Sequence, residues 1–128
     1  MSIGFLMFLA GLDTVTNALT YGMRHLAHDP ALQQRMAEDP DCIPNAVEEL
    51  LRFDPPLHLF TRHAYESVEV MGHTIPRGSE VGLLLAAANR DPGAWDRPGR
   101  FEPGRTPRPN VSFGAGLHFC VGAPLARL

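Results

Sequence analysis

Residues 113–122 read FGAGLHFCVG, and this stretch decides how the rest of the chain is interpreted. Gly114 and Gly116 flank a single alanine, so the backbone can turn tightly there and approach a bulky planar group that side chains would exclude. Cys120 follows, and the run APLARL after Gly122 predicts a helix with a proline in its first turn. The Cys120 thiol is therefore expected at a helix N-terminus, where free N–H groups and the positive dipole end favour the metal-binding thiolate.

The order F-G-x-G-x-H-x-C-x-G, followed by A-x-x-L-A-R, closely resembles the haem-binding signature of the cytochrome P450 (haem-thiolate) family. The alternative is an inert apolar thiol, which is the usual state of a lone cysteine. The resemblance implies that Cys120 is the axial iron ligand of haem b (iron protoporphyrin IX), with Phe113 near its sulfur and His118 facing a propionate. It also implies that Gly114 and Gly122 adjoin the cofactor. A thiolate ligand pushes electron density onto iron and favours O–O cleavage.

Composition limits the possible partners. The chain has 128 residues, 45% of them hydrophobic, and a formal net charge of −3. This balance argues against a nucleic-acid partner or a polybasic membrane contact, and the chain is expected to be soluble. Cys42 and Cys120 are too few for a disulfide framework, so reduced thiols and a cytoplasmic location are expected.

The N-terminal apolar segment predicts a helix. Residues 3–12 are apolar but lack the positive region and cleavage site of a signal peptide, and the stretch alone is too short to span a bilayer. The wider pattern predicts a buried helix over residues 2–27. Such a helix needs protein on every side, so the sequence is expected to be a fragment. Together with the resemblance, this implies that residues 1–128 are a partial cytochrome P450 domain, incomplete at both ends.

The run AGLDT, residues 10–14, interrupts this helix. A glycine inside a helix costs up to about 1 kcal/mol against alanine, and two polar residues follow it. From the residues alone, Thr14 bonded back to a carbonyl one turn earlier and Asp13 paired with an arginine would explain the motif equally well. AGLDT also resembles the oxygen-side helix of soluble bacterial cytochrome P450s of the camphor-hydroxylase type. The resemblance implies that Ala10 and Gly11 border a groove over the haem, and that Asp13 and Thr14 deliver protons during oxygen activation.

Two further helices are predicted, over residues 31–38 and from about residue 44 to residue 54. On the second, Glu49 and Arg52 lie three apart, a spacing that contributes only about 0.2–0.5 kcal/mol when the pair is solvated. The pair resembles the E-x-x-R element of the same family. The resemblance implies a structural ion pair that docks on a later arginine, which we expect to be Arg100.

An extended, apolar-rich segment follows the two prolines at positions 55 and 56. In the family this stretch lines the substrate pocket. The resemblance therefore makes Leu57, His58 and Leu59 candidate contacts of a small apolar organic substrate. Leu6, on the predicted N-terminal helix, is a further candidate contact. Arg62 matches a position that commonly pairs with a haem propionate, and an ordinary exposed arginine is the alternative.

The second half of the chain predicts little regular structure. Alternation in residues 67–71 and the apolar run 81–88 predict a small antiparallel sheet. Residues 89–109 are rich in proline and arginine, but Trp95 and Phe101 favour a compact meander over a disordered linker. The expected fold is therefore mainly α with a small antiparallel sheet, a fragment of the cytochrome P450 fold.

Other kinds of site find less support. His25 and His28 lie at helical spacing, but no C-x-x-C or H-E-x-x-H pattern accompanies them to make a zinc site. No phosphate-binding loop or serine-esterase motif is present.

The resemblance thus implies an enzyme that activates O2 at a Cys120-ligated haem and hydroxylates a small apolar molecule, with electrons from a ferredoxin-type donor. A non-catalytic haem-binding protein, and a truncated inactive fragment that binds no cofactor, are the alternatives.

Overall fold

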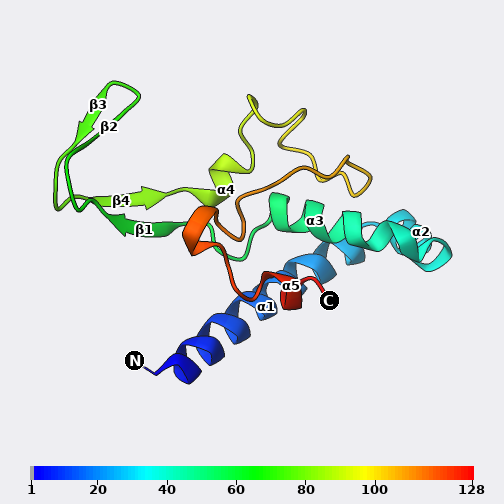
Figure 1. The fold of residues 1–128 in the computed structure, drawn as a ribbon. Helices are drawn as coiled ribbons and strands as arrows, with labels where there is room; N and C mark the ends of the chain where they lie inside the picture. The colour runs from blue at the N-terminus through cyan, green and yellow to red at the C-terminus, as the bar shows by residue number, and fades with distance from the viewer. Residues whose placement is uncertain (1) are drawn as a thin grey trace.

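The computed structural model describes residues 2–128 (Figure 1). The elements in chain order are α1 (Ile3–His28), α2 (Pro30–Glu38), the 3-10 turn η1 (Pro40–Cys42), α3 (Ile43–Phe53), β1 (Phe60–His63), β2 (Val68–Val70), β3 (His73–Ile75), β4 (Glu80–Leu83), α4 (Leu85–Ala88), η2 (Gly116–His118) and α5 (Ala123–Ala126). The described chain is mainly α with small antiparallel strand pairs, as expected from the sequence.

Side-chain caps set the ends of the first two helices. The Ser2 hydroxyl accepts a hydrogen bond from the Phe5 N–H at 3.3 Å and begins α1. Asp29 ends α1 and also caps α2, because its carboxylate accepts from the Leu32 N–H at 2.9 Å. The predicted bounds of this helix, residues 2–27, differ from the observed bounds of α1 by one residue at each end.

No residue of α1 is buried within the described chain, so the expectation of a buried helix is wrong for this chain. Ile3 is 79% exposed and Phe8 is 67% exposed. The helix contacts α2 and α3 through its C-terminal half, while the N-terminal half projects from the body (Figure 1). The apolar residues of that half have no described neighbour to cover them.

By length and composition alone, α1 could cross a membrane. The helix of 26 residues is longer than the ten-residue apolar stretch at its start, which alone is too short to span a bilayer. The core helix of a soluble protein meets the same criteria, so the property is weak evidence for a membrane span.

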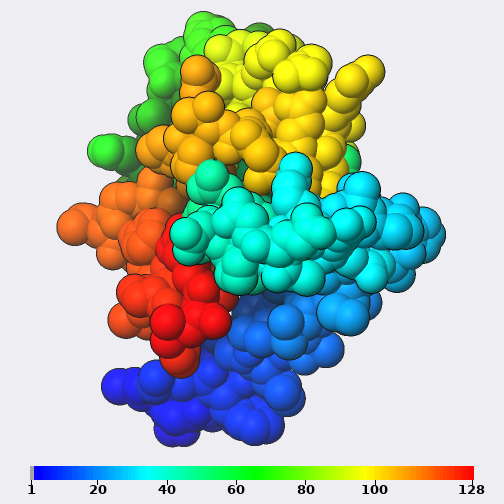
Figure 2. Space-filling model, turned by 90° about the vertical axis from the view of Figure 1, so that its right-hand side faces the viewer, coloured from blue at the N-terminus to red at the C-terminus, as the bar shows by residue number. Residues whose placement is uncertain are grey.

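Helix α3 lies at the centre of the packing (Figures 1 and 2). Ala46 and Leu51 on its apolar face are buried, and so is Trp95 of the irregular segment that wraps around it. Ala123, the first residue of α5, is also buried. The core of the described chain is therefore small and built around one short helix.

The strands form two separate antiparallel pairs instead of one sheet. β1 pairs with β4, placing Phe60 opposite Leu83, and β2 pairs with β3. In the β2–β3 hairpin, Met71 and Gly72 both have positive φ, as a type I′ turn requires. The predicted apolar strand over residues 81–88 ends at Leu83, because the alanine-rich run that follows forms α4.

Residues 89–115 contain no helix or strand and cross over α3 as a compact meander (Figure 1). This agrees with the prediction from their proline and arginine content. The meander leads directly into the cysteine loop, so its contacts with α3 determine where that loop begins.

Candidate functional site

The cysteine loop is a closed turn. Gly114 and Gly116 both have left-handed backbone conformations, with φ of +75° and +66°. The Cys120 N–H donates to the Phe113 carbonyl oxygen at 2.9 Å and joins the two ends of the loop. Residues with a Cβ rarely adopt these φ values, so the two glycines are required by the loop's path.

Cys120 is exposed. Its neighbours in the sequence include three exposed apolar residues: Leu117, Phe119 and Val121. A Cβ on Gly122 would lie 3.8 Å from the Cys120 sulfur. Helix α5 begins three residues after the cysteine and has only four residues. The loop therefore presents a free thiol on an apolar, open surface.

The donor set limits which metal group could bind here. Within residues 2–128, no three or more His, Cys, Asp or Glu side chains gather in a group that could hold a metal ion. A single thiolate fits a metal whose other ligands come with it, as the ring nitrogens of a porphyrin do. The open apolar surface beside Cys120 also fits the face of a flat macrocycle. The residues present therefore fit a haem better than a zinc ion.

The structure gives Phe113 defined contacts, whereas His118 is exposed. The Phe113 ring lies 6.3 Å from the Phe119 ring, and the Arg127 guanidinium carbon lies 4.5 Å from the Phe113 ring centre. His118 is exposed at the end of η2. The expected roles, Phe113 near the Cys120 sulfur and His118 facing a haem propionate, stay predictions.

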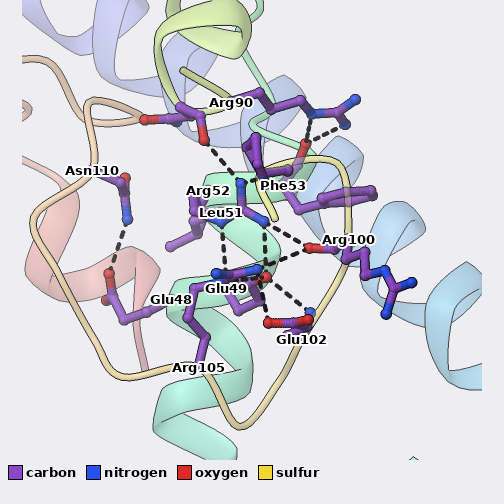
Figure 3. Close-up of polar contacts among 12 residues, drawn as sticks. Glu48, Glu49, Leu51, Arg52, Phe53, Arg90, Arg100, Glu102, Arg105 and Asn110 are labelled. Carbon is purple, nitrogen blue, oxygen red and sulfur yellow. Dashed lines mark hydrogen bonds and ion pairs between the residues drawn. The ribbon is translucent and has the colours of Figure 1, made fainter. Parts of the chain in front are cut away.

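Arg127 ties the short helix α5 to α3, a contact that was not foreseen from the sequence. Its guanidinium forms an ion pair with the Glu48 carboxylate. That hydrogen bond raises the pKa of Arg127 above its ordinary value, against the opposing effect of burial. Glu48 also accepts from the Asn110 side-chain amide at 3.4 Å (Figure 3). The segments before and after the cysteine loop are thus joined to α3 through one carboxylate.

On α1, the AGLDT motif keeps its helical geometry. The Thr14 hydroxyl donates to the Ala10 carbonyl oxygen at 2.5 Å, one turn earlier. Among the described residues Asp13 forms no ion pair, so the alternative explanation that it pairs with an arginine finds no support there. A Cβ on Gly11 would meet nothing within 4 Å. Gly11 therefore faces open space.

The cysteine loop lies in the neighbourhood of α1 without packing on it. Figures 1 and 2 view the molecule from directions 90° apart, and in both α5 and the preceding loop lie near α1, which keeps no buried residue. Segments separated by about a hundred positions in the sequence thus lie in the same region of the described chain.

The expected substrate contacts lie in exposed positions. Leu6, Leu57, His58 and Leu59 are all exposed. The Arg62 guanidinium carbon lies 4.5 Å from the Phe60 ring centre, and a guanidinium nitrogen donates to the Thr61 carbonyl oxygen at 3.1 Å. Within the described chain no carboxylate pairs with Arg62. Its charge is free to bind an anionic group.

The Glu49–Arg52 pair is buried (Figure 3). Arg52 is 1% exposed and Glu49 is 4% exposed. Two nitrogens of Arg52, Nε and Nη2, donate to the two oxygens of Glu49 at 2.7 and 2.8 Å. The remaining three N–H groups donate to backbone carbonyl oxygens of Asn89, Pro98 and Arg100 at 2.9–3.0 Å. All five donors of the guanidinium are therefore used, and the pair has the predicted structural role.

The arginine that docks on this pair is Arg105, so the expectation of Arg100 is wrong. Arg105 Nε lies 3.2 Å from the Glu49 carboxylate, whereas Arg100 contributes only its carbonyl oxygen and its side chain is exposed. The triplet Pro-Gly-Arg occurs twice, at residues 98–100 and 103–105. The two copies are alike in local sequence, and only the path of the meander decides which guanidinium reaches Glu49.

The charge state of Glu49 follows from these contacts. Burial by itself raises the pKa of the carboxyl. Hydrogen bonds from Arg52, from the Glu102 N–H at 2.9 Å and from Arg105, with the positive charge of Arg52, outweigh burial and hold the pKa below its ordinary value. Glu49 is therefore ionised in the folded chain.

A second polar cluster joins α1 to the end of α3. His25 Nε2 lies 2.8 Å from an Asp54 oxygen, and the His25 ring stacks on Phe101 with 4.2 Å between ring centres. Arg24 and Arg90 pair with the same Asp54 carboxylate at 3.1 and 3.2 Å. No local sequence pattern indicates this contact, because its members are far apart along the chain.

Comparison with known proteins places these features in a family. A family model described as Cytochrome P450 matches residues 3–128. The chain is 42% identical over 123 residues to the putative cytochrome P450 YjiB of Bacillus subtilis, covering 96% of this chain and 31% of that protein. It is also 42% identical over 127 residues to 6-deoxyerythronolide B hydroxylase of Saccharopolyspora erythraea, covering 99% of this chain and 31% of the relative.

Solved structures agree. P450BioI in complex with hexadec-9Z-enoic acid ligated acyl carrier protein has a TM-score of 0.90 at 41% identity, over 95% of this chain and 32% of that chain. CYP109E1 from Bacillus megaterium in complex with corticosterone has a TM-score of 0.92 at 34% identity, over 97% and 34%. The chain therefore spans about a third of the length of the relatives that it matches.

Proposed function

The chain belongs to the cytochrome P450 family, and from that premise we propose that the whole protein containing it is a haem-thiolate monooxygenase. One observation carries the proposal: the exposed Cys120 thiol stands on a loop closed by the Cys120 N–H to Phe113 bond. The loop lies near the helix that bears AGLDT (Figures 1 and 2). A thiol and an oxygen-side helix facing one site are what such an enzyme needs.

We assign the binding of haem b to a small set of residues. Cys120 supplies the iron ligand, while His118 and Arg62 bind the propionates. Space for the ring is left by residues that are small: Ala10, Gly11, Gly114 and Gly122. When bound, the cofactor supplies activation of O2 and transfer of one oxygen atom to a substrate. The uncommitted charge of Arg62 and the open face at Gly11 support this assignment.

Proton delivery is assigned to Asp13 and Thr14. The Thr14 hydroxyl is fixed in place by its bond to the Ala10 carbonyl oxygen. The Asp13 carboxylate is exposed to solvent. An acid and a hydroxyl on adjacent positions can therefore move a proton from water toward the site.

The substrate is proposed to be a small apolar molecule in contact with Leu6, Leu57, His58 and Leu59. Two similar proteins have been solved with largely apolar ligands: CYP109E1 with corticosterone, and P450BioI with hexadec-9Z-enoic acid carried by acyl carrier protein. The exposed leucines of α1 and of residues 57–59 support a site of the same character. A ferredoxin-type protein in the cytoplasm is the proposed electron donor.

The test is a carbon monoxide difference spectrum of the protein produced with haem and then reduced. Cys120→Ala is the variant. Cys42→Ala is the matched control, because it removes the other free thiol, which lies at the start of α3 and outside the cysteine loop. We expect a thiolate-type Soret band in the unmodified protein and in Cys42→Ala, and its loss in Cys120→Ala. The absence of that band from the unmodified protein would overturn the proposal.

Product formation separates catalysis from binding. A protein that shows the thiolate-type band but forms no oxygenated product from apolar substrates, with electrons supplied, is a non-catalytic haem binder. We expect turnover, with one oxygen atom from O2 in the product.

A further inference from the structure

Asn89 is a buried polar residue that lies outside the proposed site. It directly follows α4 and is 1% exposed. A buried amide costs free energy unless its donors and acceptor are bonded. Its hydrogen-bond partners therefore indicate what the residue does.

The partners of the Asn89 side chain lie at the entrance to the cysteine loop. Its Nδ2 donates to the Ser112 hydroxyl oxygen at 2.7 Å, and its Oδ1 accepts from the Val111 N–H at 2.9 Å. Ser112 is 9% exposed and is the residue just before Phe113. One amide thus holds two consecutive residues of the segment that leads into the loop.

Ser112 connects the entrance of the loop to α3. Its hydroxyl donates to the Leu51 carbonyl oxygen at 2.6 Å. Leu51 neighbours Arg52, whose Nη1 donates to the Asn89 carbonyl oxygen at 2.9 Å. Asn89 is therefore held by α3 through its backbone and holds the loop entrance through its side chain (Figure 3 shows Leu51 and Arg52).

The loop closes one residue further on. The Phe113 carbonyl oxygen accepts from the Cys120 N–H at 2.9 Å. The position of Cys120 consequently depends on where residues 111–113 lie, and those residues are set by the Asn89 and Ser112 bonds. Loops are positioned by such contacts with rigid elements.

We propose that Asn89, acting through Ser112, is a positioning residue for the Cys120 thiol. It holds the base of the cysteine loop at a fixed place on α3 and touches neither substrate nor cofactor. Its importance for the iron ligand rests on the proposed function. Its effect on the loop is a property of the chain itself and can be measured without haem.

The first measurement is amide hydrogen exchange in the full chain. We compare Asn89→Ala and Ser112→Ala with Ser112→Thr, which keeps the hydroxyl. Exposed residues supply matched controls: Asn45→Ala on α3 and Ser67→Ala, whose hydroxyl accepts from the Arg77 N–H. Exchange is followed at the Cys120 N–H and at the Asp54 N–H, which donates to Leu50 at the end of α3.

We expect exchange at Cys120 to accelerate about tenfold or more in Asn89→Ala and Ser112→Ala, with little change at Asp54. Ser112→Thr and both controls keep the original rates. Equal acceleration at both amides means that Asn89 supports only overall stability, and overturns the proposal. An unprotected Cys120 amide in the unmodified chain also overturns it.

The second measurement links the loop to the cofactor. In haem-loaded protein, Asn89→Ala and Ser112→Ala are expected to convert part of the carbon monoxide Soret band from the thiolate type to the non-thiolate type. Ser112→Thr restores the thiolate type. If the unmodified protein has a protected Cys120 amide but no thiolate-type band, the proposed function fails and the positioning role stands. If the band is unchanged in both alanine variants, the positioning role fails.

Discussion

Arg105 reaches back 56 positions to Glu49, and its Nε lies 3.2 Å from the Glu49 carboxylate. The contact fastens the meander to α3 just before the chain enters the cysteine loop. It also completes the set of positive charges around a buried carboxylate. Several predictions about stability depend on it.

Replacing Arg105 should be far more harmful than replacing Arg100. Arg105→Ala removes one charged partner of the buried Glu49 carboxylate while Arg52 stays paired with it, and we expect a loss of about 1–3 kcal/mol in the free energy of unfolding. Arg100→Ala keeps the carbonyl oxygen that Arg52 uses, so a loss within about 0.5 kcal/mol is expected. Urea unfolding measures both. Equal losses would refute the assignment of Arg105.

The same carboxylate predicts how stability depends on pH. The folded-state pKa of Glu49 lies below its ordinary value of 4.5. Its stabilising contribution is therefore complete above pH 4.5 and is lost as the pH falls through the lower folded pKa. Urea unfolding at a series of pH values should show the free energy of unfolding decreasing over this acid range.

A glutamine variant isolates this effect. Glu49→Gln should be less stable at neutral pH and should show a shallower decline in acid, because it has no proton to gain. Glu66→Gln, at an exposed position, is the control and should follow the unmodified chain. An unchanged acid slope in Glu49→Gln would show that other carboxyls cause it.

Thr14 and Thr20 offer a matched pair for testing proton delivery. Each hydroxyl donates to a carbonyl oxygen one turn earlier in α1, Thr14 at 2.5 Å and Thr20 at 2.7 Å. We expect Thr14→Ala to lower the yield of product per O2 consumed about tenfold or more, since general acid–base groups contribute about 10²–10⁴ in rate. Thr20→Ala should leave the yield unchanged. Similar losses in the two variants would remove the special role of Thr14.

Arg127→Ala should loosen the segment after Cys120. The variant loses the Glu48 ion pair and the contact with the Phe113 ring. Because the Arg127 side chain is partly exposed, we expect only about 0.5–1 kcal/mol less free energy of unfolding. Haem dissociation, followed by transfer to an acceptor protein, should be faster. An unaltered rate of haem dissociation would show that Arg127 does not hold the segment after Cys120.

Local sequence was enough to predict some parts of this chain. Helix α1 begins beside a serine cap and ends where Asp29 and Pro30 start the next helix, and such signals act within a few residues. The glycines of the cysteine loop are equally local, since their φ values follow from the absence of a Cβ. The mainly α fold and the candidate thiol followed from these features.

Other parts depend on contacts between distant residues. The two Pro-Gly-Arg triplets have the same local sequence, so no pattern could choose Arg105 over Arg100. Strand pairing is also non-local: Phe60 pairs with Leu83, while residues 68–75 form a hairpin of their own between them. Asn89 and Asp54 gave no signal, because a polar residue in a loop or at a helix end is usually solvated.

The full use of the Arg52 guanidinium has a consequence for the order of folding. Its bonds to Glu49 lie within one helix turn and can form as soon as α3 does. Its other acceptors come 37 to 48 positions later in the chain. We therefore expect a nucleus in which α3 already carries the paired side chains and the meander condenses on it afterwards, with φ-values high in α3 and low between residues 96 and 105.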